Sequence, residues 1–153
     1  MRAYVAGFVF SKDGSQVALI NKLKPEWQKG KLNAIGGKVE ALEVMDIVKH
    51  IESPTDAMVR EFEEETGVFI PPGEWKYRVR LFTPGEFEVF FFAAFDDIVF
   101  EVKTKEAEEV SIFKVTNILN GEYPIIPNLK WLIPLCQDKK LIGPIEIEER
   151  NAA

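Results

Sequence analysis

Three glutamates in the segment 60–68 (REFEEETGV) are spaced in a way that could do chemistry. Glu61, Glu64 and Glu65 lie three and four residues apart, so in a helix they would share one face. Like charges at this spacing destabilise a helix by roughly 0.2–0.5 kcal/mol per pair unless something neutralises them. Hard cations such as Mg²⁺ bind carboxylate oxygens and often complete their shell with phosphate oxygens. The segment therefore predicts a metal site and phosphate chemistry, although a charge run is more often a solvated helix face.

The segment 53–66 is the clearest predicted helix, and it would carry these glutamates. Ser53 suits the N-cap, Pro54 suits the first helical position, and Asp56 makes a variant of the capping box. Gly67 suits the left-handed position that follows a last helical turn. Both ends of the helix are therefore marked in the sequence.

The faces of this predicted helix separate apolar from acidic residues. At about 100° per residue, Met58, Val59 and Phe62 gather on one side and are expected to face the core. The three spaced glutamates form the neighbouring stripe. Glu63 points well away from that stripe, so we exclude it from the predicted site.

Other patterns along the chain predict a sheet with further helices. Turn signals stand at Asp13-Gly14 and Pro84-Gly85. A helix is expected over 128–138, with a kink or break at Pro134. Strands are expected over 2–10, 16–21, 77–82, 87–95, 110–115 and 142–149, with a shorter piece within 33–40 and a loop over 22–32. Strands alternating with helices around a mixed sheet indicate an α/β or α+β sandwich.

The bulk composition limits the function classes. A length of 153 residues predicts a single domain over 1–153, with room for a proper core. The net charge of −6 argues against a nucleic-acid polymer as partner, since such binding needs basic patches. No apolar run is long enough for a membrane span, and the N-terminal residues lack a signal-peptide layout. With Cys136 as the only cysteine, these features predict a cytoplasmic protein without disulfides.

The chain resembles the Nudix hydrolases, whose motif is G-x5-E-x7-R-E-U-x-E-E-x-G-U, with U a bulky aliphatic residue. The second half of the motif fits from Glu52 to Val68, with Phe62 at an aliphatic position as a mild departure. The first half fits separately, from Gly37 to Glu43. The two halves do not join, because Glu43 and Glu52 cannot both be the middle glutamate.

An insertion of nine residues within 41–51 would reconcile the two halves. We expect this segment to form a protruding loop or a short helix near the metal site, where it could shape substrate access or an oligomer interface. The correct spacing to Arg60 favours Glu52 as the motif glutamate, and Glu43 stays open as the alternative.

The resemblance implies an α/β/α sandwich with a mixed sheet and a loop–helix–loop catalytic element. It also implies that Mg²⁺ or Mn²⁺ is held by Glu61, Glu64, Glu65 and the carbonyl group of Gly37. Arg60 would pair with Glu52 or Glu64 and orient the carboxylates, a task that suits a guanidinium better than a lysine.

The metal would activate a water molecule that attacks a diphosphate linkage, and a carboxylate would take the proton. Glu61 is one candidate for this base. A glutamate from the downstream loop is another, and Glu106, Glu108 and Glu109 are available there.

Residues before and after the motif are similar to those of Nudix enzymes that hydrolyse oxidised purine nucleoside triphosphates such as 8-oxo-dGTP. Asn33 stands where an asparagine recognises the base, although a turn-forming asparagine is an equal reading. Lys38 could contact phosphate, and Trp27 could stack on a base. Asn128 stands where that subfamily has an acidic residue, and this departure weakens the case for an oxidised guanine.

The predicted function is therefore Mg²⁺-dependent hydrolysis of a purine nucleoside triphosphate to the monophosphate and pyrophosphate. One alternative is an ADP-ribose or nucleotide-sugar pyrophosphatase, because Pro84 lies near the position of a proline that marks that branch. An alternative of another class is a non-catalytic nucleotide-binding module on the same fold. The expected partners are small nucleotides only, with the chain a monomer or a homodimer.

Overall fold

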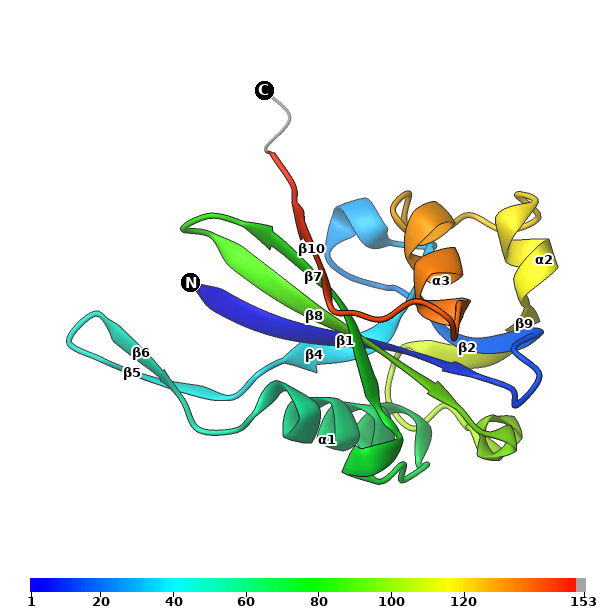
Figure 1. Cartoon of the computed structure of the whole chain (residues 1–153), viewed down its shortest axis with the longest axis horizontal. Coiled ribbons are helices and arrows are strands. Elements are labelled where there is room, and N and C mark those ends of the chain that lie inside the picture. Colours follow the sequence, from blue (N-terminus) through cyan, green and yellow to red (C-terminus); the bar gives the residue numbers. More distant parts are fainter. Residues whose placement is uncertain (151–153) are drawn as a thin grey trace.

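A mixed β-sheet forms the middle layer of the molecule (Figure 1). The computed structural model describes residues 1–150, with Glu43 and His50 in the backbone only. The strands are β1 (Arg2–Phe10), β2 (Gln16–Asn21), β3 (Leu32–Asn33), β4 (Ile35–Lys38), β5 (Ala41–Val44), β6 (Ile47–His50), β7 (Lys76–Thr83), β8 (Phe87–Phe95), β9 (Glu109–Lys114) and β10 (Ile145–Glu148). The helices are α1 (Pro54–Thr66), α2 (Val115–Leu119) and α3 (Leu129–Gln137), with 3₁₀ turns η1 (Glu26–Gln28), η2 (Pro72–Glu74) and η3 (Asp97–Glu101).

The main sheet has the strand order β10-β7-β8-β1-β2-β3, with β4 also paired to β1 and β9 paired to β2. The pairs β1–β8 and β10–β7 are parallel, and the other pairs are antiparallel. The strand β8 lies between β7 and β1, as its apolar residues on both faces predict. The sheet is therefore mixed, and β1 is the strand to which β2, β4 and β8 are all joined.

Two apolar clusters cover the two faces of this sheet. On one face α1 packs against β4 and β1 through buried Met58 and Phe62. On the other face α3 packs against β7, β8 and β1 through Leu129, Leu132 and Ile133. Figure 1 shows α1 on the side of the sheet opposite to α2 and α3. This arrangement confirms the predicted α/β/α sandwich. No helix within residues 1–150 has both the length and the apolar character that crossing a membrane requires.

Most of the predicted elements are present. The strands, the helix α1 and the turns at Gly14 and Gly85 are confirmed, and both glycines have left-handed φ values of 77° and 76°. The helix α3 continues through Pro134, so the chain is not broken there. The short helix α2 was not predicted, because five residues without a side-chain cap leave little signal in a sequence.

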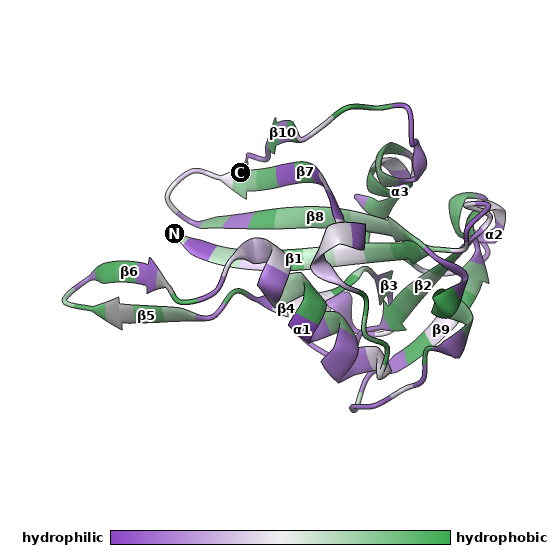
Figure 2. Cartoon of the chain, turned by 60° about the horizontal axis from the view of Figure 1, so that its bottom comes forward, coloured by the Kyte–Doolittle hydropathy of each residue, from purple (hydrophilic) through white to green (hydrophobic). Residues whose placement is uncertain are grey.

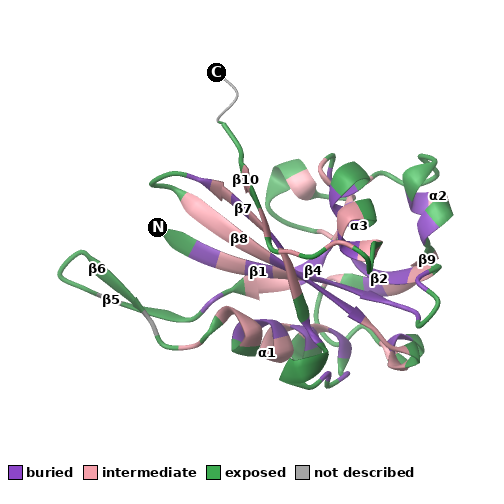
Figure 3. Ribbon diagram, viewed as in Figure 1, coloured by how far each residue is buried: buried purple, intermediate pink, exposed green. Residues whose placement is uncertain are grey.

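The segment 41–51 is not the loop or short helix that we expected, but a β-hairpin. Its strands β5 and β6 form a separate two-stranded sheet in which Val44 pairs with Ile47. The turn residues Met45 and Asp46 both have positive φ, at 52° and 66°, as a type I′ turn requires. Such turns favour Asn-Gly or Asp-Gly, so Met-Asp gives no recognisable hairpin signal. The hairpin projects from the body of the molecule, and Figure 3 shows it exposed along its length.

The close approach of β4 to β1 depends on Gly36. A methyl group at this position would overlap the carbonyl oxygen of Val5, which is backbone and cannot swing away. The strand β4 also brings Gly37 and Lys38 next to α1. The close contact of Gly36 with β1 therefore fixes the position of Gly37 and Lys38 relative to the sheet.

We expect Gly36→Ala to lower the free energy of unfolding by about 3 kcal/mol or more, because overpacking against backbone forces strands apart. Gly73→Ala is the matched control, since nothing lies within 4 Å of a methyl group there. Urea unfolding of both variants measures the difference. A Gly36→Ala variant as stable as Gly73→Ala would show that β4 is free to move.

Candidate active site

The helix α1 is held at both ends by its own sequence. The Ser53 hydroxyl accepts a hydrogen bond from the Asp56 N–H (3.1 Å), and Pro54 begins the helix. At the other end Gly67 adopts φ 77°, and its N–H donates to the Glu63 carbonyl oxygen (2.8 Å). These contacts satisfy helix-end groups that would otherwise need water, and they confirm the predicted caps.

One side of α1 is locked into the core, which fixes the rotation of the helix. Met58 and Phe62 are fully buried, and the Phe62 ring meets the Trp75 ring edge-on at 5.5 Å. The Met58 side chain lies so close to Gly7 of β1 that a methyl group there would be 2.8 Å from its sulfur. Because this apolar side is fixed, the glutamates on the adjacent stripe are held in place as well.

Arg60 is the centre of an ion-pair network on α1. Its guanidinium makes a bidentate pair with Glu52, at 2.6 Å from Nη2 and 3.2 Å from Nε. Its Nη1 donates to Glu61 (3.0 Å) and Glu64 (3.3 Å), and its Nη2 donates to the Lys38 carbonyl oxygen (3.1 Å). The sequence left Glu52 and Glu64 as alternative partners of Arg60, and both pairs form.

The network favours Glu52 as the motif glutamate. Besides Arg60, the Glu52 carboxylate accepts a hydrogen bond from the Glu40 N–H (2.8 Å), so it bridges α1 and the base of the hairpin. The hydrogen bond from Arg60 holds the pKa of Glu52 below its usual value and raises that of Arg60. Glu43 is described in the backbone only, and its side chain lies outside the described part of the molecule.

The carboxyl group of Glu61 lies directly against the backbone of Gly37. A methyl group on Gly37 would overlap this carboxyl group, so only glycine admits Glu61 to its position. Burial is the main reason that the pKa of Glu61 is raised, and the Arg60 pair only partly offsets it. The predicted ligands Glu61 and Gly37 are therefore adjacent.

Glu65 carries a polar atom that lacks a protein partner. Its Oε2 is buried and has no hydrogen-bond partner among the residues that the structure describes. Burial, together with the charges of Glu106, Glu61 and Glu108, raises the pKa of Glu65 from 4.5 to about 7. A buried carboxylate oxygen without a donor costs free energy, and a bound cation would remove that cost.

These observations fit a hard divalent cation beside α1. The unpartnered Oε2 of Glu65 and the Glu61–Gly37 contact both lie where the sequence places a metal. Among the side chains that the structure describes, however, no three acidic, histidine or cysteine residues already converge as a metal cage. Arg60 holds Glu61 and Glu64 in its own network, so these carboxylates would have to turn from Nη1 to reach a shared ion.

The three downstream glutamates differ in their surroundings. Glu108 accepts hydrogen bonds from Lys22 Nζ (2.9 Å) and the Leu23 N–H (2.7 Å). Burial opposes ionisation of Glu108, but these donors outweigh it and lower its pKa, so Glu108 serves as an anchor between two loops. Glu106 is exposed, and its charge is felt by both Glu61 and Glu65. Glu109 is also exposed, at the start of β9.

A pocket with a volume of about 690 Å³ lies on the α3 face of the sheet, beyond the end of the core. We call it the sheet pocket. Side chains that alternate along β1 form the floor of the pocket. Tyr4 and Ala6 lie on the same face of β1 as buried Phe8 and Phe10, which stand further along the strand. Val89 of β8 pairs with Tyr4 and continues this floor. The size is typical of a small-molecule site.

The structure brings together the four residues predicted to bind substrate. Trp27, Asn33, Lys38 and Asn128 come from four separate segments, and all of them line the sheet pocket. The Asn33 amide is already oriented, since its Nδ2 donates to Gln28 (3.1 Å) and its Oδ1 accepts from the Ala34 N–H (2.8 Å). One N–H and one lone pair of this amide stay available to a ligand.

Several pocket residues escaped sequence reasoning. Glu149 is the only acidic residue among the described residues that line the pocket. It follows β10, where half-buried Ile145 and Ile147 alternate with exposed Glu146, so it falls on the inward side. The alternation along β10 is visible in the sequence, but only the pairing of β10 with β7 brings Glu149 to the pocket. The others missed include Tyr4, Lys22, Gln28 and Val89.

Gly37 joins the two halves of the site. It lines the sheet pocket on one side and touches the Glu61 carboxyl group on the other. A molecule seated in the pocket can therefore reach the α1 carboxylates past the edge of β4. This arrangement suits a ligand with an aromatic or apolar end and an anionic end that a cation could neutralise.

Comparison with known proteins identifies a matching domain family and several structures with a similar fold. A family model of the NUDIX domain matches residues 1–132. The structure is similar to one from work on MutT of Aliivibrio salmonicida and Vibrio cholerae, with TM-score 0.66, 23% identity, and coverage of 89% of this chain and 96% of that one. It is also similar to mutator MutT protein from Bacillus halodurans (TM-score 0.64, 24% identity, 90% and 82% coverage).

A third similar structure is an ADP-ribose pyrophosphatase from Streptococcus suis, with TM-score 0.62, 15% identity, and coverage of 97% of this chain and 98% of that chain. At these low identities the likeness concerns the fold. Among curated proteins, no sequence matches the chain at a significant level.

We expect the metal-free protein to lose stability as the pH rises from 4.5 to about 7. The pKa of Glu65 is raised from 4.5 to about 7, so in this window the folded state keeps a proton that the unfolded state has released. Because the unfolded state binds fewer protons, the free energy of unfolding falls with pH and levels off above the window. Thermal unfolding with a chelator, at about pH 5 and about pH 8, measures the change.

Glu65→Gln should flatten this pH dependence, and Glu63→Gln, on the exposed side of α1, should leave it as in the wild type. Added Mg²⁺ should stabilise the wild type more at about pH 8 than at about pH 5, because metal binding needs the deprotonated carboxylate. Parallel curves for wild type and Glu65→Gln would contradict the role given to Glu65.

Proposed function

The chain belongs to the Nudix family, and we propose that it hydrolyses a purine nucleoside triphosphate to the monophosphate and pyrophosphate with the aid of Mg²⁺. As a Nudix pyrophosphohydrolase it is an enzyme that acts on small nucleotides with a divalent metal ion. The observation that carries the finer proposal is the double role of Gly37, which borders both the sheet pocket and the Glu61 carboxyl group.

Magnesium would be held by Glu61, Glu64, Glu65 and the Gly37 carbonyl group. When bound, the ion polarises the phosphate and lowers the pKa of a water molecule. Mg²⁺ prefers oxygen ligands and commonly binds through carboxylates together with substrate phosphates. The donor set beside α1 consists of oxygen atoms alone, which favours Mg²⁺ or Mn²⁺ over metals that prefer sulfur or imidazole.

The protein residues would position and deprotonate the attacking water. Arg60 holds Glu61 and Glu64 near one another until substrate and metal arrive. Water attacks a phosphorus atom of the diphosphate linkage, the bridging P–O bond breaks, and the water proton passes to a carboxylate. The acceptor would be Glu61, Glu106 or Glu109, since Glu108 is engaged with Lys22 and Leu23.

The walls of the sheet pocket support a purine as the base. Trp27 is largely exposed at the rim, where its indole ring can stack on a base. Asn33 and Asn128 offer amide donors and acceptors, as a purine edge requires. Glu149 adds an acceptor without a donor, which favours a base edge that presents N–H groups, such as that of guanine. Lys38 stands where the phosphate chain would leave the pocket.

The ADP-ribose alternative is favoured by the position of Pro84 and by the likeness to the Streptococcus suis structure. In this chain Pro84 lies in the turn between β7 and β8 and precedes Gly85, which has φ 76°. A tight turn accounts for that proline without any substrate. We therefore propose the nucleoside triphosphate as the substrate, with ADP-ribose as the competing one.

We expect Glu64→Gln to slow hydrolysis by roughly 10²–10³-fold, comparable to the loss of one electrostatic group in an active site. Glu63→Gln is the matched control, because it removes the same charge from the adjacent exposed residue and should leave the rate near that of the wild type. Initial rates of phosphate-bond cleavage at saturating Mg²⁺ measure both. Equal rates for the two variants would remove Glu64 from the metal site.

A panel of 8-oxo-dGTP, dGTP, dATP and ADP-ribose, with product analysis, should identify the substrate. We expect the guanine nucleotides to have a kcat/KM at least about tenfold above that of dATP, since one unpaired polar group costs about 1–3 kcal/mol. The products should be the monophosphate and pyrophosphate, and chelation of Mg²⁺ should abolish turnover. Preferential cleavage of ADP-ribose to AMP would establish the alternative instead.

A further inference from the structure

The β5–β6 hairpin presents apolar side chains to solvent although the enzyme reaction does not use them. Leu42, Val44 and Ile47 lie on the same face of the hairpin, because Leu42 pairs with Lys49 and Val44 pairs with Ile47. Together with Met45 in the turn they form what we call the tip face. Met45 is 90% exposed and Ile47 69%, and Figure 2 shows the hydrophobic colouring of this projecting element.

Two features of the hairpin make its exposed conformation unfavourable unless another surface covers it. A two-stranded sheet without further cover is marginally stable in water, and β5 and β6 pair only with each other among the described strands. Met45 also adopts a left-handed φ of 52°, a conformation that bulky side chains avoid. A bulky apolar residue that is both strained and exposed points to a contact that covers it.

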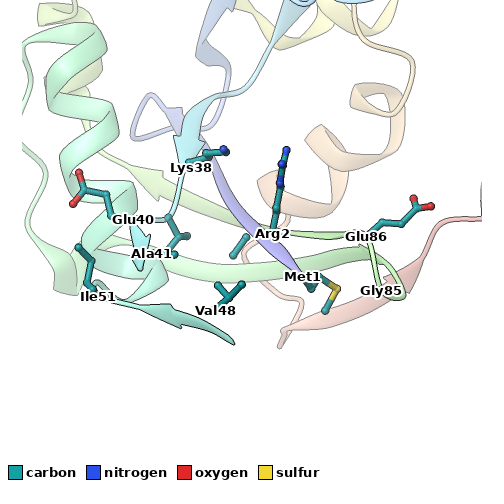
Figure 4. Close-up of a pocket in the computed structure, with 11 residues that line it drawn as sticks. Met1, Arg2, Lys38, Glu40, Ala41, Val48, Ile51, Gly85 and Glu86 are labelled. Carbon is teal, nitrogen blue, oxygen red and sulfur yellow. The ribbon is translucent and has the colours of Figure 1, made fainter. Parts of the chain in front are cut away.

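The opposite face of the hairpin borders a groove on the same molecule. Ala41, Val48 and Ile51 face Met1 and Gly85 across this groove, which has a volume of about 680 Å³ (Figure 4). Two basic residues, Arg2 and Lys38, and two acidic residues, Glu40 and Glu86, also line it, so the charges along its wall balance. The exposed tip face is apolar and so is much of the groove wall, so tip and groove match in polarity.

We propose that the chain forms a two-fold symmetric homodimer in which the hairpin tip of each copy occupies the groove of the other. A surface that contains both the projection and the cavity that accepts it is self-complementary, as a two-fold interface requires. The four exposed apolar side chains of the tip face offer a few hundred Å² per copy, which is in the range of the largest patch of a typical monomer and supplies part of the ~800 Å² per partner of a standard interface. The remaining area would come from the groove walls.

Sedimentation velocity over about a hundredfold range of concentration tests the assembly, because a dimer dissociates on dilution. The wild type should sediment at twice 17.4 kDa at high concentration. The Val44→Thr/Ile47→Thr variant should sediment as a monomer, since threonine keeps the β-propensity and shape of the strand but adds a hydroxyl. Ile142→Thr is the matched control, because Ile142 is 97% exposed outside the hairpin, and it should stay dimeric.

Ala41→Arg tests the groove, since it places a long charged side chain in the cavity and leaves the tip face intact. It should dissociate the dimer as well. A wild type that is monomeric throughout, or a Val44→Thr/Ile47→Thr variant that stays dimeric, would overturn the proposal. If the Ala41→Arg variant stays dimeric, the proposed binding of the tip in the groove is wrong. Circular dichroism of each variant checks that the fold is retained.

Discussion

The bidentate pair between Arg60 and Glu52 is the interaction on which the rest of the site depends. It joins β4, the end of the hairpin segment and α1, because Glu52 also accepts from the Glu40 N–H and Arg60 donates to the Lys38 carbonyl oxygen. Exposed ion pairs contribute little, but these groups are largely shielded and share several hydrogen bonds. Without the guanidinium, several carboxylates would face one another at the edge of the sheet. The first effect of Arg60 is therefore to reduce the repulsion among these negative charges.

A second constraint comes from the two glycines of β4, which act in opposite directions. Gly36 lets the strand approach β1, and Gly37 lets the Glu61 carboxyl group approach the strand. A strand is normally thick enough to separate a pocket on one face from a helix on the other. Here the missing side chains reduce that separation to the backbone itself. The carbonyl group of Gly37 can therefore belong to the metal site while its other side borders the sheet pocket.

The sequence was most informative where the determinants are local. The caps Ser53 and Gly67 and the rotation of α1 follow from residues close together in the chain, and the structure agrees with them. The choice of Glu52 over Glu43 stays a prediction, which the ion pair between Glu52 and Arg60 supports. Trp27 and Asn128 were found by resemblance, and only the fold shows that they share a pocket. Glu149 was missed because its place depends on the pairing of β10 with β7, and the hairpin was missed because Met45-Asp46 is an unusual type I′ turn.

The hairpin and the Arg60 network share residues, so the proposed assembly and the proposed catalysis would be coupled. Glu40 and Glu52 stand at the two ends of the hairpin segment, and the Ile51 N–H donates to the Glu40 carbonyl oxygen and closes its base. If a second copy holds the hairpin in one position, it also restricts the carboxylate that holds Arg60. Metal binding that draws Glu61 and Glu64 away from Arg60 would act on the same pair from the other side. Since coupling between binding sites is reciprocal, any effect of dimerisation on metal affinity must equal the effect of the metal on dimerisation.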